Sequence, residues 1–520
     1  MKILPNLAEI PRKQWFLMMS STIAGSMAYS LHFILEFSVL LKAGLPIFFI
    51  VFHFFGLFAG SGIALRFVSK ISHFKAYIVN TSFMALTFIS LILINQTWYI
   101  PFGLFFGGTT IGINFGLMYE QIAKTLEDRK FAGRIFALGF SLISVVMIVQ
   151  SFIEMIGNIW YYSLYYIILL LLYLCFISLG RKAKHKIPQK SINFSRILKK
   201  KDNLPGFSVA FFYGFFFVNT YYISILILKE TELLYKFYLF LIVFFIFAGL
   251  FSFPAGLIAD ILGRRFTILL GCLTQALAFL ILSFINQIDI TFFILFPLVL
   301  GFGFALSINT MVLIFSELPD REFIRTHSSL FVIFTALGNL SGVIIGELLL
   351  NLYLIEPAYL TVILLFIIVC ASVAIFQLRE TLPPKEELEW KNSLQYIYII
   401  KKTGIPLYDQ SLNHRSLYKE KVHTDLLSGV LTAISSVLQE IADNQSPLKL
   451  IKQEGFNIII EEGKEVYVAV ISLKELKIIK KKMQDFLIEF ETFFEDLICL
   501  DHCDLLAFSP AKTIVKKYFY

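Results

Sequence analysis

Charged residues are scarce in this chain of 520 residues, where Asp, Glu, Lys and Arg together make up 16% of the composition. A soluble globular chain carries about 25% charged residues, so a large water-exposed surface is excluded for most of this sequence. Hydrophobic residues supply 57% of the chain, and Phe alone occurs 57 times. This composition is typical of a membrane protein with many spanning segments.

Cysteine is also scarce, with five residues in total. Cys175, Cys272 and Cys370 fall in apolar runs, where they are expected to pack as small side chains. Cys499, Asp501, His502 and Cys503 are metal-ligand types. However, four ligands within five residues suit a tetrahedral zinc site poorly, and no second cluster exists, so no metal is expected.

The sequence lacks a phosphate-binding loop, and no nucleophile, base and orienting acid can be assembled from its spacings. Neither ATP hydrolysis nor enzymatic catalysis is expected, and no cofactor is predicted. The net charge is +8. The basic residues nevertheless alternate with apolar runs and fall mostly in loops, as a bilayer topology requires, so nucleic-acid binding is disfavoured.

Hydropathy predicts an all-α membrane region, because its apolar runs are long enough to cross about 30 Å of hydrocarbon as helices. Twelve spans are predicted near 15–37, 44–66, 76–95, 98–119, 132–154, 159–180, 205–228, 237–258, 266–285, 290–314, 327–350 and 357–378. A polar segment rich in Lys and Arg separates the sixth span from the seventh. We therefore expect two six-helix halves, 1–180 and 205–378, joined by a basic loop at 181–204.

Lys and Arg gather in the loops on one side of these spans, whereas the other side has only Lys42, Lys229 and Lys236. By the positive-inside rule, both termini and the central loop are predicted to lie in the cytoplasm, with the spans in the plasma membrane. The first apolar run is too long for a cleaved signal peptide and lacks a small-residue cleavage site.

A short charged turn, Gly256-Leu-Ile-Ala-Asp260-Ile-Leu-Gly263-Arg264-Arg265, follows the eighth span. Glycine permits close helix approach, and the charges hold the turn in water. Two six-helix halves, a basic central loop and this turn together resemble the major facilitator superfamily of secondary transporters over residues 10–380. The resemblance implies alternating access, a small-molecule substrate and a cytoplasmic gate at the turn.

In the resembled family the acid of this turn faces the positive N-terminus of a helix in the opposite half. We therefore expect Asp260 to lie against the start of the fifth helix, near Lys130 or Arg134. The glycine-rich fourth helix ends at Glu120, and Glu120 and Arg134 are predicted to form a second gate ion pair. Packing alone is an alternative reason for the glycines of that helix.

The turn after the second span, Arg66 to Ile78, aligns without gaps on the turn after the eighth, as the internal repeat of this fold implies. Lys70 falls where Asp260 stands, and Arg66 and His73 replace the two glycines. We hypothesise that Lys70 pairs with an acid at the entry to the eleventh span when the gate is shut. The candidate acids are Glu317, Asp320 and Glu322. Alternatively, Lys70 is only a positive-inside anchor.

Ionisable side chains inside hydrocarbon cost free energy unless they are paired or hydrated, so the few in the predicted spans are candidates for function. They are His32, Glu36, His53, Glu154 and Glu347. His32 and Glu36 lie four residues apart on one helix face, and with His53 they form a candidate proton site. The alternatives are hydrogen-bonded packing for the histidines and solvation at the outer interface for the glutamates.

Polar residues near the middle of the spans that line the cavity in the resembled family are the candidate substrate contacts. They are Ser26, Asn114, Asn219, Tyr222 and Asn309. No Lys or Arg falls at the midplane, so a highly anionic substrate would lack its counter-charge. A neutral, cationic or amphiphilic solute is expected.

The composition changes after Leu378, where a charged linker with two prolines (379–392) leads into a soluble domain (393–520). Its pattern predicts strands at 396–400 and 406–412, a helix at 425–441, strands at 448–453, 456–461 and 466–472, and a helix at 475–497. This order resembles the longin and roadblock family of small α/β domains of archaeal type. The resemblance implies a small GTPase partner or self-association; a purely stabilising domain is the alternative.

Two functions remain open from the sequence. The first is a secondary transporter with a cytoplasmic regulatory domain, for which proton coupling is one option. The second is a non-transporting membrane anchor that presents the C-terminal domain, because Lys70 replaces the gate acid in the first half. The intact turn from Gly256 to Arg265 favours the transporter.

Overall fold

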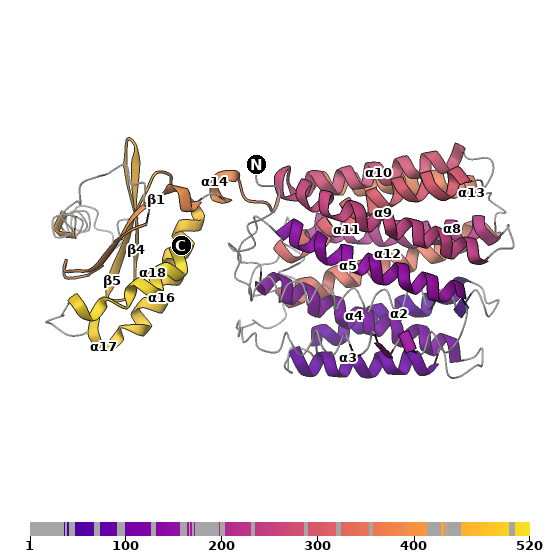
Figure 1. The fold of residues 1–520 in the computed structure, drawn as a ribbon, viewed down its shortest axis with the longest axis horizontal. Coiled ribbons are helices and arrows are strands. Elements are labelled where there is room, and N and C mark those ends of the chain that lie inside the picture. Colours follow the sequence, from indigo (N-terminus) through magenta and orange to yellow (C-terminus); the bar gives the residue numbers. More distant parts are fainter. Residues whose placement is uncertain are drawn as a thin grey trace. The chain divides into compact units, whose positions relative to one another are not determined.

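The chain forms two compact units, Met1–Leu382 and Pro383–Tyr520, which are treated separately below (Figure 1). The structure is a computed structural model. It describes residues 36, 39–40, 47–66, 73–90, 99–125, 132–156, 164–165, 167–168, 171, 197, 203–229, 234–284, 290–318, 324–352, 357–388, 390–412, 428–430, 433, 449–498 and 505–519.

The first unit, called the membrane unit here, consists of helices and short connections in its described residues. A short 3-10 helix, η1 (Ile47–Ile50), precedes the long helices. These are α2 (Val51–Arg66), α3 (His73–Phe88), α4 (Ile100–Thr125), α5 (Ala132–Ile156), α8 (Asn203–Lys229), α9 (Leu234–Ile261), α10 (Arg264–Phe284), α11 (Ile290–Glu317), α12 (Ile324–Leu352) and α13 (Pro357–Gln377). They coincide with the predicted spans two to five and seven to twelve.

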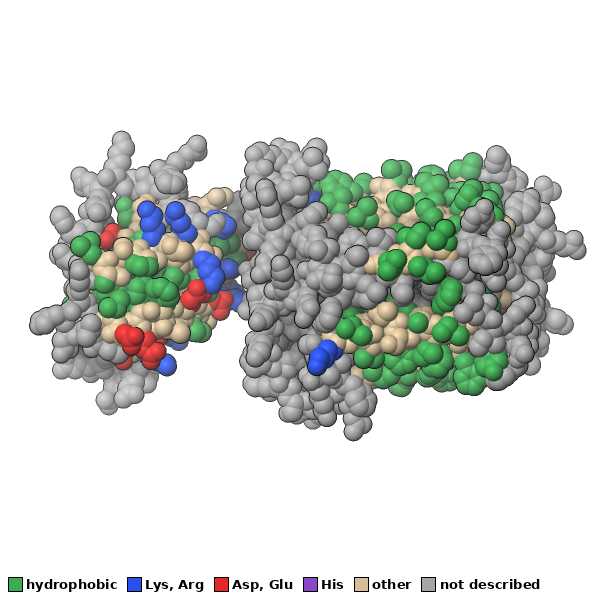
Figure 2. Space-filling model, turned by 60° about the horizontal axis from the view of Figure 1, so that its bottom comes forward, with side chains coloured by type: hydrophobic (Ala, Val, Ile, Leu, Met, Phe, Trp, Pro, Cys, Tyr) green, Lys and Arg blue, Asp and Glu red, His purple; other side chains and the backbone are tan. Residues whose placement is uncertain are grey.

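Seven of the described helices are long and apolar enough to cross a membrane, and a shorter apolar stretch lies at Val362–Gln377. The predicted count of twelve is therefore supported only in part. Most of the predicted spans 15–37 and 159–180 lies outside the described residues. Leu250, Val362 and Phe366 are each more than half exposed. Figure 2 shows such hydrophobic side chains over much of the described surface of this unit, as contact with lipid requires.

Helix pairs within and between the two halves of the membrane unit are closely packed. In the first half α2 packs on α4; in the second, α8 packs on α12 and α10 on α11. Contacts of α5 with α9 and of α2 with α12 join one half to the other. The candidate site described below lies along this junction.

The second unit, called the C-terminal unit, contains an antiparallel five-stranded sheet of order β2-β1-β5-β4-β3. It starts with α14 (Lys385–Leu388) and η7 (Trp390–Ser393). The strands are β1 (Leu394–Lys401), β2 (Pro406–Ser411), β3 (Leu450–Gln453), β4 (Phe456–Glu462) and β5 (Val466–Ser472). Beyond them are α16 (Lys477–Phe493), α17 (Glu495–Ile498), η8 (Leu505–Phe508) and α18 (Ala511–Phe519).

β-branched residues alternate along the central strands, so one set of side chains faces α16 and α18 and the other faces the opposite side. Ile397 and Ile399 join the core that includes Phe486 and Phe490 of α16. Tyr398 and Ile400 belong to a separate cluster on the other face. All five predicted strands are present. The predicted helix at 425–441 lies mostly outside the described residues, and the resemblance to longin and roadblock domains stays a prediction.

Candidate functional site

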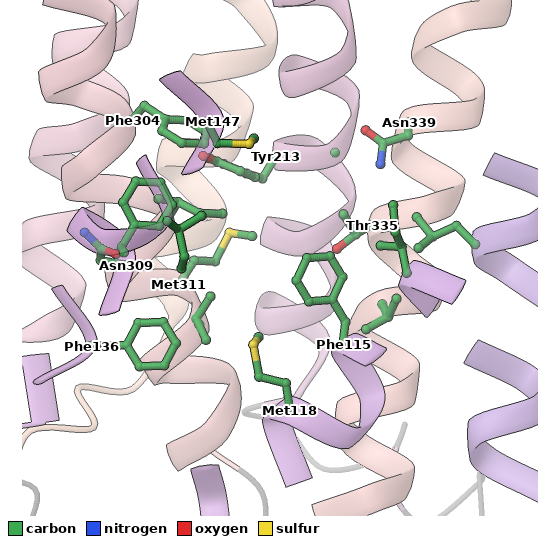
Figure 3. A pocket seen from close by; sticks show the side chains of 18 of the residues that line it. Phe115, Met118, Phe136, Met147, Tyr213, Phe304, Asn309, Met311, Thr335 and Asn339 are labelled. Carbon is green, nitrogen blue, oxygen red and sulfur yellow. The ribbon is translucent and has the colours of Figure 1, made fainter. Parts of the chain in front are cut away.

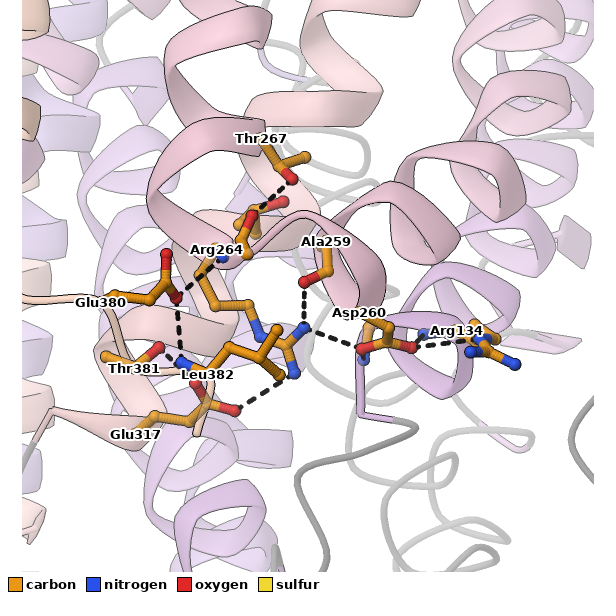
Figure 4. A network of polar contacts seen from close by, with 12 residues as sticks. Arg134, Ala259, Asp260, Arg264, Thr267, Glu317, Glu380, Thr381 and Leu382 are labelled. Atoms are coloured by element: carbon orange, nitrogen blue, oxygen red, sulfur yellow. Dashed lines mark hydrogen bonds and ion pairs between the residues drawn. The ribbon is translucent and has the colours of Figure 1, made fainter. Parts of the chain in front are cut away.

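Asp260 lies buried in the last turn of α9 and accepts hydrogen bonds from the start of α5 (Figure 4). The backbone N–H of Gly133 donates to Oδ1 at 2.8 Å, and that of Arg134 donates to Oδ2 at 3.0 Å. The Arg134 Nε also lies 3.3 Å from Oδ2. A helix start has unpaired N–H groups and partial positive charge, which favour a carboxylate by about 0.3 to 1 kcal/mol. The second half is thus tied to the first.

Two glycines permit this close approach. A Cβ on Gly133 would lie 2.5 Å from the Gly256 carbonyl oxygen and 2.6 Å from Asp260 Oδ1, and a Cβ on Gly256 would overlap the Gly133 carbonyl. Further along the same helices, the Ser141 hydroxyl donates to the Gly249 carbonyl at 2.9 Å. The α5 and α9 backbones therefore stay close over about two turns.

Arg264, the first residue of α10, is fully buried between two carboxylates. Its Nη1 donates to Asp260 Oδ1 at 2.8 Å and to the Ala259 carbonyl at 2.5 Å. Its Nη2 lies 3.5 Å from Oε1 of Glu317, at the end of α11. The series Arg134, Asp260, Arg264 and Glu317 thus alternates in sign and balances two positive charges with two negative ones. Balance of this kind is what allows charges to stay buried.

Glu380, just after α13, caps the start of α10. Its Oε1 accepts from the Arg264 backbone N–H at 2.9 Å, and its Oε2 from that of Arg265 at 3.0 Å. The Leu382 N–H donates to the same carboxylate at 2.9 Å. Thr381 donates to Glu317 Oε2 at 2.5 Å. The sequence predicts Glu380 only as part of the linker 379–392, and its contacts with the start of α10 depend on tertiary packing that the sequence does not show.

Gly263 joins α9 to α10 with φ at +106°, a left-handed conformation that favours glycine. A Cβ there would lie 2.6 Å from Glu380 Oε2. The Arg265 side chain donates to the Leu378 carbonyl at 3.4 Å. The turn from Gly256 to Arg265 is therefore enclosed by α5 on one side and by the segment after α13 on the other.

Several predicted site residues lie outside the described residues, or their side chains do. They are Ser26, His32, Arg66, Lys70, Glu120, Asn219 and Tyr222. Of the acids proposed as partners of Lys70, only Glu317 is described, and it contacts Arg264 and Thr381. Glu347 is half-buried on α12, and Glu154 is buried on α5.

A cavity of about 110 Å³ lies between the two halves (Figure 3). Residues of α2, α4 and α5 form its first-half wall, and residues of α8, α9, α11 and α12 form its second-half wall. Phe, Met, Ile and Leu predominate, and no Asp, Glu, Lys or Arg occurs among the described lining residues. Asn309 lines the cavity, whereas Asn114 is buried on α4 outside its lining. Tyr213, Thr335 and Asn339 also line it and were not predicted.

His53, on α2, lines the cavity and pairs with Glu36. Its Nδ1 lies 2.5 Å from Glu36 Oε2, and the two side chains are 1% and 0% exposed, so solvent does not screen the pair. Gly107 of α4 makes room for it, because a Cβ there would overlap Glu36 Oε1. The structure thus brings together two of the three residues of the predicted proton site.

Two helical halves, a cavity between them and a buried charged network that joins the start of α5 to the end of α9 are typical of a secondary transporter. The chain belongs to the Major Facilitator Superfamily, whose family model matches residues 135–322 and 207–442, together more than half of the chain. It is accordingly a multi-pass membrane transporter and not an enzyme. A search of the curated proteins found no match.

Among solved structures, the crystal structure of the human organic anion transporter MFSD10 (TETRAN) is similar. The TM-score is 0.54, with 12% sequence identity, over 70% of this chain and 99% of that chain. At this level of identity, the similarity shows a shared fold alone.

Proposed function

We propose that this chain carries a small neutral, cationic or amphiphilic solute across the plasma membrane by alternating access. The cavity is the substrate site, and the network of Arg134, Asp260, Arg264 and Glu317 is the lock at the predicted cytoplasmic end. One observation carries the proposal. A buried, charge-balanced network joins α5 of the first half to α9, α10 and α11 of the second, beside the cavity that both halves line.

Opening at this end requires α5 to leave α9, which would strip Asp260 of the Gly133 and Arg134 N–H groups. Removing one partner from a buried ion pair costs about 3 to 5 kcal/mol. Substrate binding or proton binding must supply a comparable difference for the halves to exchange. In this proposal Glu120 and Lys70 add further ion pairs to the same gate, with Asp320 or Glu322 as the Lys70 partner; Lys70→Glu with unchanged transport would contradict that part.

Proton coupling is assigned to Glu36 and His53. A neutral imidazole leaves the buried Glu36 carboxylate uncompensated, whereas one added proton neutralises the pair. Because His53 lines the cavity, the net charge of the pair changes the electrostatic interaction with a bound substrate. The pair can therefore couple one proton to one substrate.

A regulatory role is proposed for the C-terminal unit. Its two apolar clusters, one on each face of the sheet, make it a domain with its own core. Recognition of a small GTPase or of a second copy follows only from the resemblance stated above. Both partners remain part of the proposal.

Proteoliposomes containing a pH-sensitive dye test the transport proposal. A panel of neutral, cationic and amphiphilic solutes should drive proton movement through the unaltered chain. Asp260→Asn should reduce it at least about tenfold, since the buried ion pair is broken. Asp409→Asn, the same chemical change on β2 of the C-terminal unit, serves as the matched control and should leave it unchanged.

If folded protein gave neither proton movement nor uptake with any solute of the panel, transport would be contradicted and a membrane-anchored scaffold favoured. Solute uptake without proton movement would support the transport proposal and contradict the role of Glu36 and His53 in proton coupling. Equal proton flux through Asp260→Asn and the unaltered chain would contradict the role of the charged network as a lock.

A further inference from the structure

Two amide side chains line the cavity on opposite sides of an apolar space. They belong to Asn309 of α11 and Asn339 of α12. Figure 3 shows each amide oxygen directed toward the space between the two residues. Met311 and Phe115, which also line the cavity, are drawn in the stretch that separates them. A solute in the cavity therefore meets a polar group at each end and apolar side chains along its middle.

Each amide presents a buried acceptor atom. The Asn309 Nδ2 donates to the Ala305 carbonyl at 2.9 Å, which directs the amide nitrogen to the backbone of α11 and fixes the position of Oδ1. Oδ1 of Asn309 and Oδ1 of Asn339 are both buried and have no hydrogen-bond partner among the described residues. The two residues are 1% and 5% exposed. A buried acceptor without a partner is unfavourable, so each oxygen favours a ligand group that donates a hydrogen bond.

The other polar lining residues have partners within the protein. His53 pairs with a carboxylate, and the Thr335 hydroxyl donates to a backbone carbonyl of α12 at 2.9 Å. The Tyr213 hydroxyl lies 3.2 Å from Ser307 Oγ. Asp, Glu, Lys and Arg do not occur among the described lining residues. The site thus offers two separate acceptors, and no described lining side chain of these four types would balance a charged head group.

We infer that the cavity binds a neutral, two-headed solute with a hydrogen-bond donor at each end of an apolar body. Hydroxyl groups and primary amides are donors of this kind. One end donates to Asn309 Oδ1 and the other to Asn339 Oδ1, while the body lies against the Phe and Met side chains of the lining. This inference rests on the transport function proposed above and names the substrate class of the same site.

A two-headed neutral solute fits these groups better than the alternatives. An amphiphile with one head satisfies one oxygen and places its apolar end against the other, which stays buried without a donor. A charged head would be buried without an opposite charge from the described lining residues. A tertiary amide or an ether would place an acceptor against an acceptor.

Four probes with one carbon chain and different ends test the inference: octanediamide, octanamide, N,N,N′,N′-tetramethyloctanediamide and octane-1,8-diamine. Binding to the purified full chain is measured by calorimetry, with detergent micelles alone as the blank. Octanediamide should bind at least about tenfold more tightly than each of the other three, because only it brings two neutral donor ends. Apolar burial alone predicts the opposite order for octanamide, which has more apolar surface.

Chain length gives a second test on the unaltered chain. Both ends must reach oxygens that are fixed in place, so affinity along the diamides from butanediamide to dodecanediamide should pass through a maximum. Apolar burial alone strengthens binding with each added methylene group. A steady rise would therefore overturn the inference. The monoamides of the same lengths are the control, and a maximum at the same length in that series would indicate a limit on size and would also overturn it.

Variants then locate the two ends. Asn309→Leu and Asn339→Leu should each weaken binding of octanediamide about tenfold, or about 1.4 kcal/mol, and leave the tetramethyl probe unaffected. Thr274→Val is the control, since its hydroxyl donates to the Leu270 carbonyl of α10 and Thr274 is not among the lining residues. Equal weakening of both probes would indicate a changed cavity shape instead of lost acceptors and would overturn the assignment.

Uptake separates this inference from the transport proposal. It is measured in proteoliposomes and corrected for protein-free liposomes. Uptake of octanamide, the tetramethyl probe or the diamine as readily as octanediamide would leave transport standing and overturn the two-headed class. Binding with the expected preferences but without uptake would support the inference and contradict the transport function. Absence of binding by all four probes would overturn the substrate class, whatever the wider solute panel shows.

Discussion

Arg264 connects the Asp260 ion pair to several other elements of the membrane unit. Its side chain contacts Asp260 and Glu317, while its backbone N–H is held by Glu380. One residue therefore connects α9, α10, α11 and the segment after α13.

Glu475, which precedes α16, gives a pH-dependent prediction for the C-terminal unit. Hydrogen bonds from Lys452 and Lys480, at 2.8 and 2.7 Å, lower the pKa of its carboxyl to about 2. A carboxyl with a lowered pKa in the folded state stabilises the fold above its ordinary pKa of 4.5, and this contribution is lost as pH falls toward about 2. The effect is small, because the group is exposed and solvent screens it.

The unfolding temperature of the C-terminal unit in the full chain should therefore be higher for the unaltered chain than for Glu475→Gln near neutral pH. The difference should shrink as pH falls from about 4.5 to about 2 and then vanish. Glu454→Gln, in the exposed β3–β4 turn, is the control. A difference independent of pH would show that charge is not the cause.

At the scale of elements, long apolar runs were enough to predict the helices. The predicted span 237–258 falls within α9 (Leu234–Ile261), because about 20 apolar residues in sequence have few alternatives to a spanning helix. The position of Asp260 against α5 followed from the resemblance to a family with two related halves. The C-terminal strands followed from period-two alternation and turn residues.

Other features of the site were beyond the reach of the sequence. Asn339 and Tyr213 are single polar residues in apolar helices, and nothing in the sequence distinguishes a cavity-facing position from a packed one. The sequence predicts His32 beside Glu36 on one helix face with His53 nearby, and the described contact to Glu36 comes from His53 of α2. Glu380 acts on α10 more than a hundred residues away. Such pairings depend on tertiary packing.

The approach of α5 to α9 makes a prediction about these two helices. Gly256→Ala should separate them at the predicted cytoplasmic end, since its Cβ would overlap the Gly133 carbonyl, and overpacking costs about 1 to 3 kcal/mol. Spin labels at the exposed positions Lys75 and Leu262, in a background without the native cysteines, report the distance between the halves. In Gly256→Ala, a larger fraction of molecules should show a longer distance between the two spin labels.

Gly62→Ala on α2 is the matched control, because its Cβ would meet nothing within 4 Å. Its distance distribution should equal that of the unaltered chain. An unchanged distribution in Gly256→Ala would show that the glycine contact does not hold the halves together.

At the scale of the whole molecule, the boundary between the two units falls within the predicted linker. Glu380, Thr381 and Leu382 belong to the membrane unit, and Pro383 begins the C-terminal unit. The last residues before the boundary are also those that cap α10 and bind Glu317. The described residues of the network therefore all belong to the membrane unit, which sets a clear point at which to divide the chain.

Two truncated chains test this division. A chain ending at Leu382 keeps Glu380 and Thr381, and its uptake in proteoliposomes should remain near that of the full chain. A chain ending at Leu378 loses the carboxylate that caps α10, worth about 0.5 to 2 kcal/mol by analogy with other helix caps, and loses the Thr381 hydroxyl on Glu317. Its uptake and its unfolding temperature should both fall. Since the two chains differ by four residues, a folded but inactive chain ending at Leu382 would show instead that the C-terminal unit is itself required for transport.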